Sequence, residues 1–361
     1  PPSYMGIERT IRVGILTAPK IEYELREHTF LLKNVRIGIG FHWDRYEDQE
    51  FEGKLEIQQN ADGTETAINI IALEDYLTSV ISSEMAATSN IELLKAHAVI
   101  SRSWALRAMG IKTYNENEKP IRNTTGHIGY DVCADDHCQR YEGLRRRNER
   151  AIEAVRATQG QVLTYNSEIC DCRYYKCCGG RSEEFETCWE DIHVPYLESI
   201  ECPYCLEATG DTPWAKNFRA RYLNNYDQET LDFHDWTVRY SADQLSEIIR
   251  NKSGIDFGLI TDLRPLKRGK SGRIYALEVV GTKQTKTIGK ELVIRQYLSE
   301  KCLYSSWFDI EREGTDFVFK GHGWGHGAGL CQIGAAVMAE HGTDYRKILC
   351  HYYQHTQIQT I

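Results

Sequence analysis

The sequence contains no run of eighteen or more apolar residues, which is about the length that an α-helix needs to cross a bilayer. We therefore expect no membrane-spanning segment. Residues 1–20 also lack the charged start and the apolar core of a secretory signal peptide. Because the sequence opens at Pro1 and Pro2 without an initiator methionine, we expect that an export signal or an anchor has been removed from it.

The chain also lacks an excess of positive charge. Its formal net charge is −9, which argues against nucleic acid as a partner, because that binding depends on clustered lysine and arginine. The one basic run, residues 145–147, is followed by Glu149 and Glu153 and is typical of a solvated helix face. By contrast, 21 tyrosines and 7 tryptophans are present. Flat rings bind the C–H faces of sugars, although they also build cores and interfaces.

Low-complexity linkers and internal repeats are absent as well, and 361 residues suffice for one large domain or two ordinary ones. Strands and helices are predicted in blocks, which favours an α+β fold. Residues 1–72 are interpreted as a β-rich N-terminal segment and residues 73–361 as a second region, unless one continuous domain runs from about 9 to 361. Strands are expected at residues 9–16, 54–59 and 64–71.

The second region is expected to open with a central helix pair, residues 73–85 and about 89–109. A β-structured part follows, and a Gly-rich loop with two further helices closes the chain. Residues 113–147 and 176–235 are interpreted as mostly irregular. Additional helices are expected at 148–158, 243–250, 330–341 and 344–353, and strands at 161–165, 169–175, 236–240, 273–280, 285–288 and 317–319.

Glu84 stands on the apolar side of the first predicted helix. It follows Val80 by four residues, Leu77 by seven and Leu73 by eleven, so the helical period puts all four on one face. Burial disfavours an ionised carboxyl and raises its pKa, which suits a general acid near neutral pH. The alternative is that the helix ends here and Glu84 merely faces solvent.

Arg102 is a matching anomaly on the second predicted helix, in line with Ile91, Leu94, Ala98 and Ala105. A guanidinium in an apolar stripe needs a partner. We expect Arg102 to orient the catalytic group or to contact a carboxylate of the substrate. A structural ion pair with another carboxylate is the alternative.

Twelve cysteines are many for a reduced compartment, and nine of them lie between Cys133 and Cys205. Two histidines and two cysteines fall within twelve residues, a set that suits tetrahedral zinc: His127, Cys133, His137 and Cys138. The rival interpretation is a disulfide between Cys133 and Cys138.

The segment Cys202-Pro-Tyr-Cys205 has the spacing of a redox motif, but it lies in an irregular stretch without the strand and helix of a thioredoxin-like unit. We interpret it as a disulfide or a metal knuckle, with Cys170, Cys172 or Cys188 as candidate partners.

Residues 321–335 read GHGWGHGAGLCQIGA. Glycines at alternate positions permit positive φ and a close approach to a ligand, and the following helix would direct free N–H groups at the loop. Trp324 is a candidate to stack on a sugar ring, and His326 and Gln332 are candidates to hydrogen-bond it. Alternatively, Trp324 fills the core beneath the loop. The spacing matches neither a dinucleotide-binding fingerprint nor a P-loop.

These segments resemble the stage II sporulation protein D family. ALEDYLTSVISSEM followed by LLKAHAVISRSWALRAM is similar to the family's helix-pair signature, with His97 where the family usually has glutamine. The Gly-rich segment resembles a second family motif, with Leu330 and Cys331 in place of Met-Ser. Because QVLTYN, YYKCCGGRSEE and ILCHYYQHT resemble further segments, the resemblance covers about residues 9–361.

The resemblance implies a lytic transglycosylase with Glu84 as the catalytic residue, cutting the β-1,4 bond from N-acetylmuramic acid to N-acetylglucosamine in bacterial peptidoglycan. It places Arg102 at the family's helix arginine and strengthens the expectation of structural zinc at residues 127–138. Tyr352 becomes a further candidate for a substrate contact, with packing as the alternative.

We therefore expect an extracytoplasmic protein with a cleft for glycan strands, preferably stripped of stem peptides, lined by the helix pair and the Gly-rich loop. With a net charge of −9, binding should depend on rings and hydrogen bonds rather than on charge. The main alternative is a non-catalytic wall-binding amidase enhancer, which would assist a cell-wall amidase and other wall-remodelling proteins. A zinc amidase or peptidase is disfavoured, because the sequence lacks a His-Glu-x-x-His motif.

Overall fold

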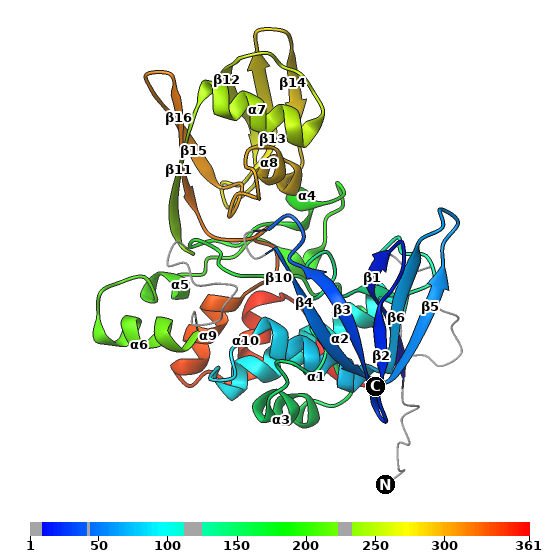
Figure 1. Ribbon diagram of the computed structural model, residues 1–361. Helices are drawn as coiled ribbons and strands as arrows, with labels where there is room; N and C mark the ends of the chain where they lie inside the picture. The colour runs from blue at the N-terminus through cyan, green and yellow to red at the C-terminus, as the bar shows by residue number, and fades with distance from the viewer. Residues whose placement is uncertain (1–8, 42–43, 112–124, 223–232) are drawn as a thin grey trace. The chain divides into compact units, whose positions relative to one another are not determined.

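The computed structural model describes residues 9–41, 44–111, 125–222 and 233–361, and it confirms the α+β class, with helices and several separate sheets in one chain (Figure 1). Parts of the two predicted irregular stretches, 113–124 and 223–232, lie outside the described residues. Within the described part, no helix combines the length and the apolar character needed to span a bilayer.

The chain forms two compact units. The first comprises Pro1–Cys172 with Asp344–Arg346 and Thr356–Ile361, and the second comprises Arg173–Thr343 with Lys347–His355. The boundary expected after residue 72 is not a border of either unit. Strand β6 (Glu65–Ala72) runs directly into helix α1 (Leu73–Glu84), with Ala72 as the residue that precedes the helix, so no linker separates them.

The N-terminal part of the first unit contains two mainly antiparallel sheets, in the region that was expected to be β-rich. A four-stranded sheet has the order β5-β6-β1-β7, in which β1 (Thr10–Ala18) pairs antiparallel with β6 and parallel with β7 (Val132–Cys133). Strand β5 (Lys54–Gln59) closes one edge, and a second sheet is formed by β2 (Tyr23–Leu25), β3 (Thr29–Ile37) and β4 (Arg45–Glu52). The alternate residues Ile11, Val13 and Ile15 of β1 are buried and supply the core of this unit.

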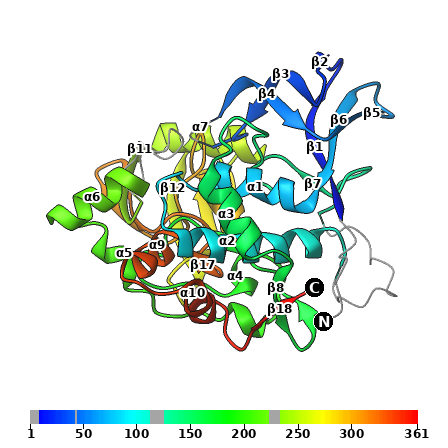
Figure 2. The ribbon, with the colours of Figure 1, turned by 90° about the horizontal axis from the view of Figure 1, so that it is seen from below.

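Three helices of the first unit pack against one another: α1, α2 (Ile91–Ala108) and α3 (Glu149–Ala157) (Figure 2). Helix α2 begins after Asn90, whose side chain accepts a hydrogen bond from the backbone N–H of Glu92. The last strand of the chain, β18 (Gln357–Thr360), pairs antiparallel with β8 (Gln161–Tyr165), and β9 (Glu168–Ile169) pairs with the other edge of β8. The end of the sequence thus completes a sheet beside α2.

The second unit contains three small sheets: β10 (Tyr174–Tyr175) with β17 (Leu330–Cys331); β11 (Asp235–Ser241), β16 (Asp316–His322) and β15 (Phe308–Glu313); and β12 (Ile260–Arg268), β13 (Ile274–Gly281) and β14 (Thr285–Ile288). Its helices are α4 (Phe185–Cys188), α5 (Tyr204–Glu207), α6 (Pro213–Tyr222), α7 (Ala242–Ser253), α8 (Glu291–Tyr297) and α9 (Gln332–Glu340). Helix α10 (Tyr345–Tyr352) and a 3-10 turn (Pro195–Leu197) complete the described elements.

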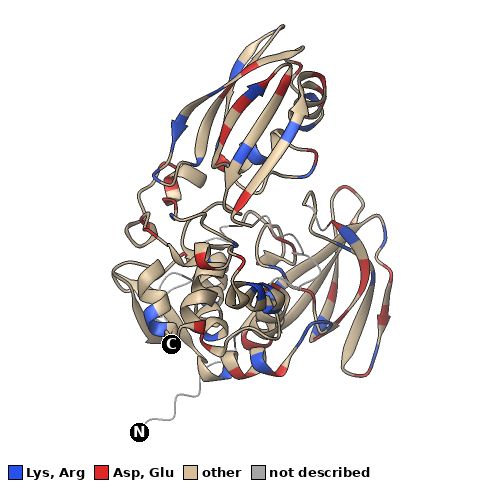
Figure 3. Ribbon diagram, turned by 90° about the vertical axis from the view of Figure 1, so that its left-hand side faces the viewer, with Lys and Arg blue, Asp and Glu red and all other residues tan. Residues whose placement is uncertain are grey.

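Most predicted elements of the second unit are confirmed, including the β13–β14 hairpin, α7, α9 and α10. The strand expected at 169–175 is instead split into β9 and β10. Strand β12 has no counterpart in the sequence analysis, because it carries Pro265 and a run of exposed residues and so lacks the alternation that marks a half-buried strand. In Figure 3, acidic and basic residues are interspersed along the ribbon.

Candidate functional site

Glu84 is the last residue of α1, and it is neither fully exposed nor sealed in the core. Leu73, Leu77 and Val80 on the same helix face are at most 5% exposed, whereas Glu84 is half-buried. Its Oε1 atom accepts a hydrogen bond of 3.2 Å from the backbone N–H of Arg140. The carboxylate is therefore held in place by the main chain and remains accessible, as a group that must meet a substrate requires.

The segment 139–143 fixes the end of α1 through several hydrogen bonds. The amide N–H of Glu142 donates to Ser83 Oγ at 3.2 Å, and Ser79 Oγ donates to the carbonyl of Gly143 at 2.7 Å. Tyr76 of α1 donates to the side-chain oxygen of Gln139 at 3.2 Å. The position of Glu84 therefore depends on a chain segment more than fifty residues further along the sequence.

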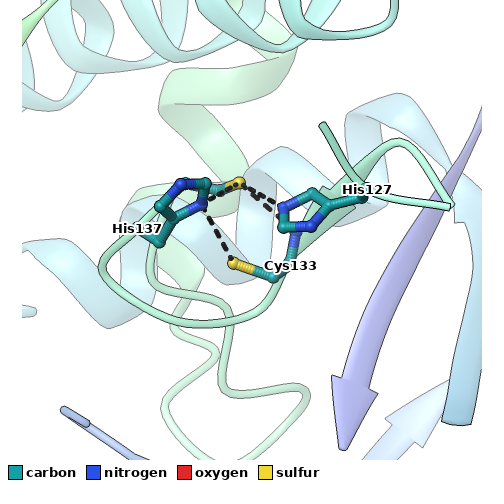
Figure 4. A group of neighbouring side chains, drawn as sticks. His127, Cys133 and His137 are labelled. Atoms are coloured by element: carbon teal, nitrogen blue, oxygen red, sulfur yellow. Dashed lines mark hydrogen bonds between the residues drawn. The ribbon is translucent and has the colours of Figure 1, made fainter. Parts of the chain in front are cut away.

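Directly before this segment, the structure brings the four predicted metal ligands together. One ligand atom from each of His127, Cys133, His137 and Cys138 lies within 4.8 Å of the others. His127 Nε2 lies 3.3 Å from Cys138 Sγ, and His137 Nδ1 lies 3.5 Å from the same sulfur. Figure 4 shows the two imidazole rings and Cys133 turned toward a common point.

The chemistry of this cluster fits a zinc ion. Cys133 and Cys138 are free thiols in the structure rather than a disulfide. The sulfur of Cys138 accepts a hydrogen bond of 3.4 Å from the backbone N–H of Cys133, an arrangement that favours a thiolate. Cys138 and His137 lower the pKa of Cys133 to about 4, against the opposing effect of burial. Two cysteine sulfurs and two imidazoles are the kind of donor set that a closed, structural zinc site takes.

Arg102 does not have the predicted role of a substrate contact, and this expectation is corrected. Its guanidinium is 1% exposed and forms a two-point ion pair with Glu74 of α1, at 2.8 Å and 2.7 Å. A third hydrogen bond reaches the carbonyl of Gln161 at 3.0 Å. The structural ion pair, the alternative interpretation of the apolar stripe, is the one that the geometry supports.

The alternate glycines of the Gly-rich loop serve packing within the protein. Gly323, Gly325, Gly327 and Gly329 all have positive φ. A Cβ on Gly329 would lie 2.0 Å from the carbonyl oxygen of Arg173, and one on Gly327 would lie 2.6 Å from the guanidinium carbon of Arg273. The glycines were expected to let the backbone approach a ligand closely. In the structure they let it approach other segments of the same chain instead.

Three of the residues that were predicted to contact the substrate are buried. Trp324 is 7% exposed and packs edge-on against Tyr304 at 4.8 Å, as the core-filling alternative requires. Gln332 is 6% exposed. Tyr352 is 1% exposed, and its hydroxyl lies 3.1 Å from Cys202 Sγ. These three side chains are corrected to packing positions, because a sugar cannot reach them without rearrangement.

His326 is also engaged inside the protein. Its Nδ1 atom accepts from the backbone N–H of Ala328 at 3.1 Å, and a backbone group of Tyr174 hydrogen-bonds the ring as well. The ring packs edge-on against Trp189 at 4.8 Å. Burial, with the charges of nearby arginines, holds its pKa well below the ordinary value, so the imidazole is neutral. His326 is nevertheless partly exposed, so its expected hydrogen bond to a sugar stays a prediction.

A buried network that the sequence analysis missed holds the Gly-rich loop. Glu183 is fully buried and accepts from Ser271 Oγ at 2.6 Å, and its backbone N–H donates to the carbonyl of Gly327 at 2.7 Å. The guanidinium of Arg273, also fully buried, donates to Ser271 Oγ at 3.0 Å and to the carbonyl of Gly325 at 3.2 Å. Arg273 stands in a predicted strand among apolar residues, the same kind of signal that singled out Arg102.

Comparison with known proteins places these sites in a family context. Residues 61–165, which include α1, α2 and the cysteine–histidine cluster, match the sequence model of the family described as Stage II sporulation protein. Residues 183–329 match a domain of unknown function. Stage II sporulation protein D of Bacillus subtilis is 29% identical over 294 residues, which cover 81% of this chain and 76% of that protein.

Two further relatives differ in how much of their length is matched. An uncharacterised protein of Brachyspira hyodysenteriae is 28% identical, with 82% of this chain and 68% of the relative covered. The amidase enhancer of Bacillus subtilis is 25% identical, and 78% of this chain aligns with 40% of that protein.

The helix pair and the cluster that follows it thus define a stage II sporulation protein domain. The chain as a whole is similar to stage II sporulation protein D and to the amidase enhancer, in agreement with the resemblance of its motifs. This similarity supports a role related to the cell wall.

Proposed function

We propose that this protein is a lytic transglycosylase of peptidoglycan, with Glu84 as the catalytic acid and base. The observation that carries the proposal is the position of Glu84: a half-buried carboxylate at the end of a buried helix, held at 3.2 Å by the Arg140 N–H. A carboxyl that is partly desolvated, oriented by the backbone and still accessible has the properties of a general acid.

In the proposed reaction, the protonated Glu84 carboxyl donates its proton to the oxygen that bridges N-acetylmuramic acid and N-acetylglucosamine. The bond from muramyl C1 to that oxygen breaks, and the N-acetylglucosamine side leaves with the proton. The Glu84 carboxylate then takes the proton of the muramyl C6 hydroxyl as that oxygen bonds to C1. The product is a 1,6-anhydro end, and Glu84 is protonated again for the next cycle.

This mechanism needs one catalytic carboxylate, whereas hydrolysis of a glycoside ordinarily needs two. The neighbouring acidic residues support the simpler scheme. Asp136 forms an ion pair with Arg140 at 3.0 Å, and Glu142 is 1% exposed and paired with Arg146 at 2.9 Å. Among the described residues of this segment, both of these carboxylates are thus engaged by arginines.

The set His127, Cys133, His137 and Cys138 would hold a structural zinc ion, which supplies folding free energy and no step of the reaction. Its place in the sequence, directly before Gln139 and Arg140, gives the cluster a positioning role for Glu84. The substrate would be glycan strands, preferably without stem peptides, and the protein would act outside the cytoplasm.

A second function is favoured by one specific comparison, the likeness to the amidase enhancer. In that case the chain would bind the wall and assist a cell-wall amidase without cutting glycan. The two functions separate by mass spectrometry of purified glycan strands incubated with the protein. The transglycosylase releases anhydro-muropeptides or anhydro-disaccharides, whereas the binding module releases none.

Glu84→Gln is the decisive variant, because it keeps the size and hydrogen bonding of the side chain and removes the proton transfer. Cleavage should fall by more than the roughly 10²–10⁴-fold typical of a single proton transfer, because Glu84 acts twice. Asp75→Asn, on the same helix and about half exposed, is the matched control and should keep its activity. Near-normal cleavage by a folded Glu84→Gln variant would refute the assignment.

A further inference from the structure

A second group of cysteines lies in the second unit, in three stretches that are far apart in sequence. Cys177 and Cys178 follow β10, Cys202 and Cys205 flank the start of α5, and Cys331 ends β17 and caps α9. All five side chains are fully buried, and all are free thiols. The expected partners of Cys202 and Cys205 were positions 170, 172 or 188, and the fold supplies different ones.

The five sulfurs form two overlapping groups of three, Cys177, Cys205 and Cys331 in one and Cys178, Cys202 and Cys331 in the other. Cys178 Sγ lies 3.2 Å from Cys205 Sγ. The sulfurs of Cys178, Cys202 and Cys331 lie within 4.8 Å of one another, and Cys205 also neighbours Cys202 and Cys331. Cys178, Cys202, Cys205 and Cys331 are therefore each beside the other three, whereas Cys177 neighbours Cys205 and Cys331.

Backbone N–H groups donate hydrogen bonds to two of these sulfurs, as is usual for thiolates. The N–H of Gly180 donates to Cys178 Sγ at 3.3 Å, and the N–H groups of Cys178 and Gly334 both donate to Cys331 Sγ at 3.3 Å. A neutral thiol is a weak acceptor, so three such bonds favour the charged form. Burying several thiolates together is unfavourable unless a cation binds them.

His234 provides an independent observation at the same place. Its ring is 7% exposed, and Nδ1 lies 2.7 Å from a carboxylate oxygen of Asp235. Its Nε2 atom is buried without a hydrogen-bond partner among the residues that the structure describes, and the ring neighbours Cys205. A metal-bound thiolate at Cys205 would give that N–H an acceptor, and the Asp235 carboxylate would fix the ring, as outer partners of metal sites do.

We propose that Cys178, Cys202, Cys205 and Cys331 bind a second zinc ion as a tetrathiolate site. Zinc–sulfur bonds of about 2.3 Å put tetrahedral sulfurs roughly 3.8 Å apart, and the separations in the structure lie on either side of this spacing, at 3.2 Å for Cys178 and Cys205 and within 4.8 Å for Cys178, Cys202 and Cys331. A four-iron cluster holds each thiolate on a different iron and so needs a wider cage. Four protein ligands close the coordination sphere, so the site is structural.

The proposed site would fasten the beginning of α9, and with it the end of the Gly-rich loop, to the chain after β10 and to the start of α5. These are the places where the second unit has little regular structure. The zinc ion would thus replace hydrophobic core that short elements such as α5 and β17 cannot supply.

The test uses the full chain, purified without added metal and with a non-chelating reductant, and measures zinc by mass spectrometry. Wild type should hold about two equivalents, and the variants Cys133→Ser/Cys138→Ser and Cys178→Ser/Cys205→Ser about one each. Cys302→Ser, which removes a buried cysteine outside both clusters, is the control and should keep both ions. X-ray absorption of Cys133→Ser/Cys138→Ser should show four sulfur ligands at about 2.3 Å.

If the variants fail to fold, the wild type alone decides, because two sites of the proposed composition average about three sulfur ligands and one nitrogen per zinc. The proposal is overturned if wild type binds a single zinc that Cys133→Ser/Cys138→Ser loses. A disulfide between Cys178 and Cys205 in peptide mapping, or an iron–sulfur absorption spectrum, would overturn it equally.

Discussion

The backbone N–H of Arg140 donates a hydrogen bond to the side chain of Glu84, and Arg140 follows Cys138 by two residues. The candidate catalytic carboxylate and the candidate metal cluster are therefore joined by one short, hydrogen-bonded piece of chain. Tyr76 and Gln139 add a second connection between α1 and this piece. Catalytic geometry and metal binding should for this reason respond together to mutation.

Shortening Glu84 by one methylene tests how far the reaction depends on this geometry. Glu84→Asp keeps the carboxyl but withdraws it from the Arg140 N–H, and a displacement of about 1 Å can cost roughly 100-fold in rate. We expect that loss in the rate of anhydro-product formation, with a nearly unchanged melting temperature. Full activity of the aspartate variant would show that the Arg140 hydrogen bond does not position the catalytic group.

Removal of one predicted zinc ligand tests whether the metal cluster helps to position Glu84. Cys138→Ser should lose about one equivalent of zinc, lower the melting temperature and reduce glycan cleavage, because the chain that orients Glu84 begins at the next residue. Zinc content, calorimetry and product analysis on the same preparation measure the three effects. Loss of zinc with unaltered cleavage would separate the cluster from the catalytic site.

The ion pair between Arg102 and Glu74 predicts a stability effect. Arg102→Met leaves the carbonyl of Gln161 without its donor and Glu74 without its partner. Because Glu74 is one-third exposed, we expect a cost of about 2–3 kcal/mol rather than the larger cost of a fully buried pair. Glu74→Gln in the Arg102→Met background should cost less than in wild type when unfolding is followed with denaturant. Additive effects would exclude coupling between the two side chains.

His97 predicts a loss of stability in acid. The ring is fully buried on α2, beside Ser101 Oγ at 3.1 Å, and burial lowers its pKa from 6.5 to about 3. Between these two pKa values the unfolded chain binds a proton at His97 that the folded chain does not bind. The contribution of the neutral ring to the free energy of unfolding is therefore complete above pH 6.5 and declines as the pH falls toward 3.

His97→Gln, which introduces the residue usual in the related family, removes that titration. We expect the free energy of unfolding of the variant to fall less between pH 7 and 4, by an amount on the order of 2–3 kcal/mol. Parallel curves for the two proteins in denaturant titrations across this range would contradict the prediction.

Trp324 tests the corrected interpretation of the Gly-rich loop. Because it is buried against Tyr304, Trp324→Ala should lower the free energy of unfolding by about 3 kcal/mol or more through the cavity that it creates. Thermal unfolding measures the effect. A variant that melts like wild type but no longer binds glycan strands would restore the role of a sugar platform.

Most of the fold could be predicted from local patterns in the sequence. The apolar stripe from Leu73 to Val80 predicted α1 and placed Glu84 at its end, because both depend on neighbours three or four residues away. Arg102 was recognised as anomalous for the same reason. Its partner could not be named, because Glu74 meets it only when two helices pack, and nothing in the spacing of 28 residues specifies that.

The two cysteine groups show the same limit. The set from His127 to Cys138 lies within one short segment and could be predicted as a unit. Cys178 and Cys331 are 153 residues apart, and only the pairing of β10 with β17 brings them together. For the Gly-rich loop, the sequence predicted the backbone conformation correctly but could not tell whether a ligand or the chain itself fills the space that the glycines leave.

The packing around those glycines has a consequence for how the family is recognised. Side chains are excluded at Gly327 and Gly329 by Arg273 and by the backbone at Arg173, so any descendant that keeps this architecture must keep the motif, whether or not it still cuts glycan. Divergence toward a purely adhesive or regulatory protein would leave the glycines untouched and would become visible at position 84. The motif is therefore evidence for the fold, whereas position 84 is where the proposed chemistry can be tested.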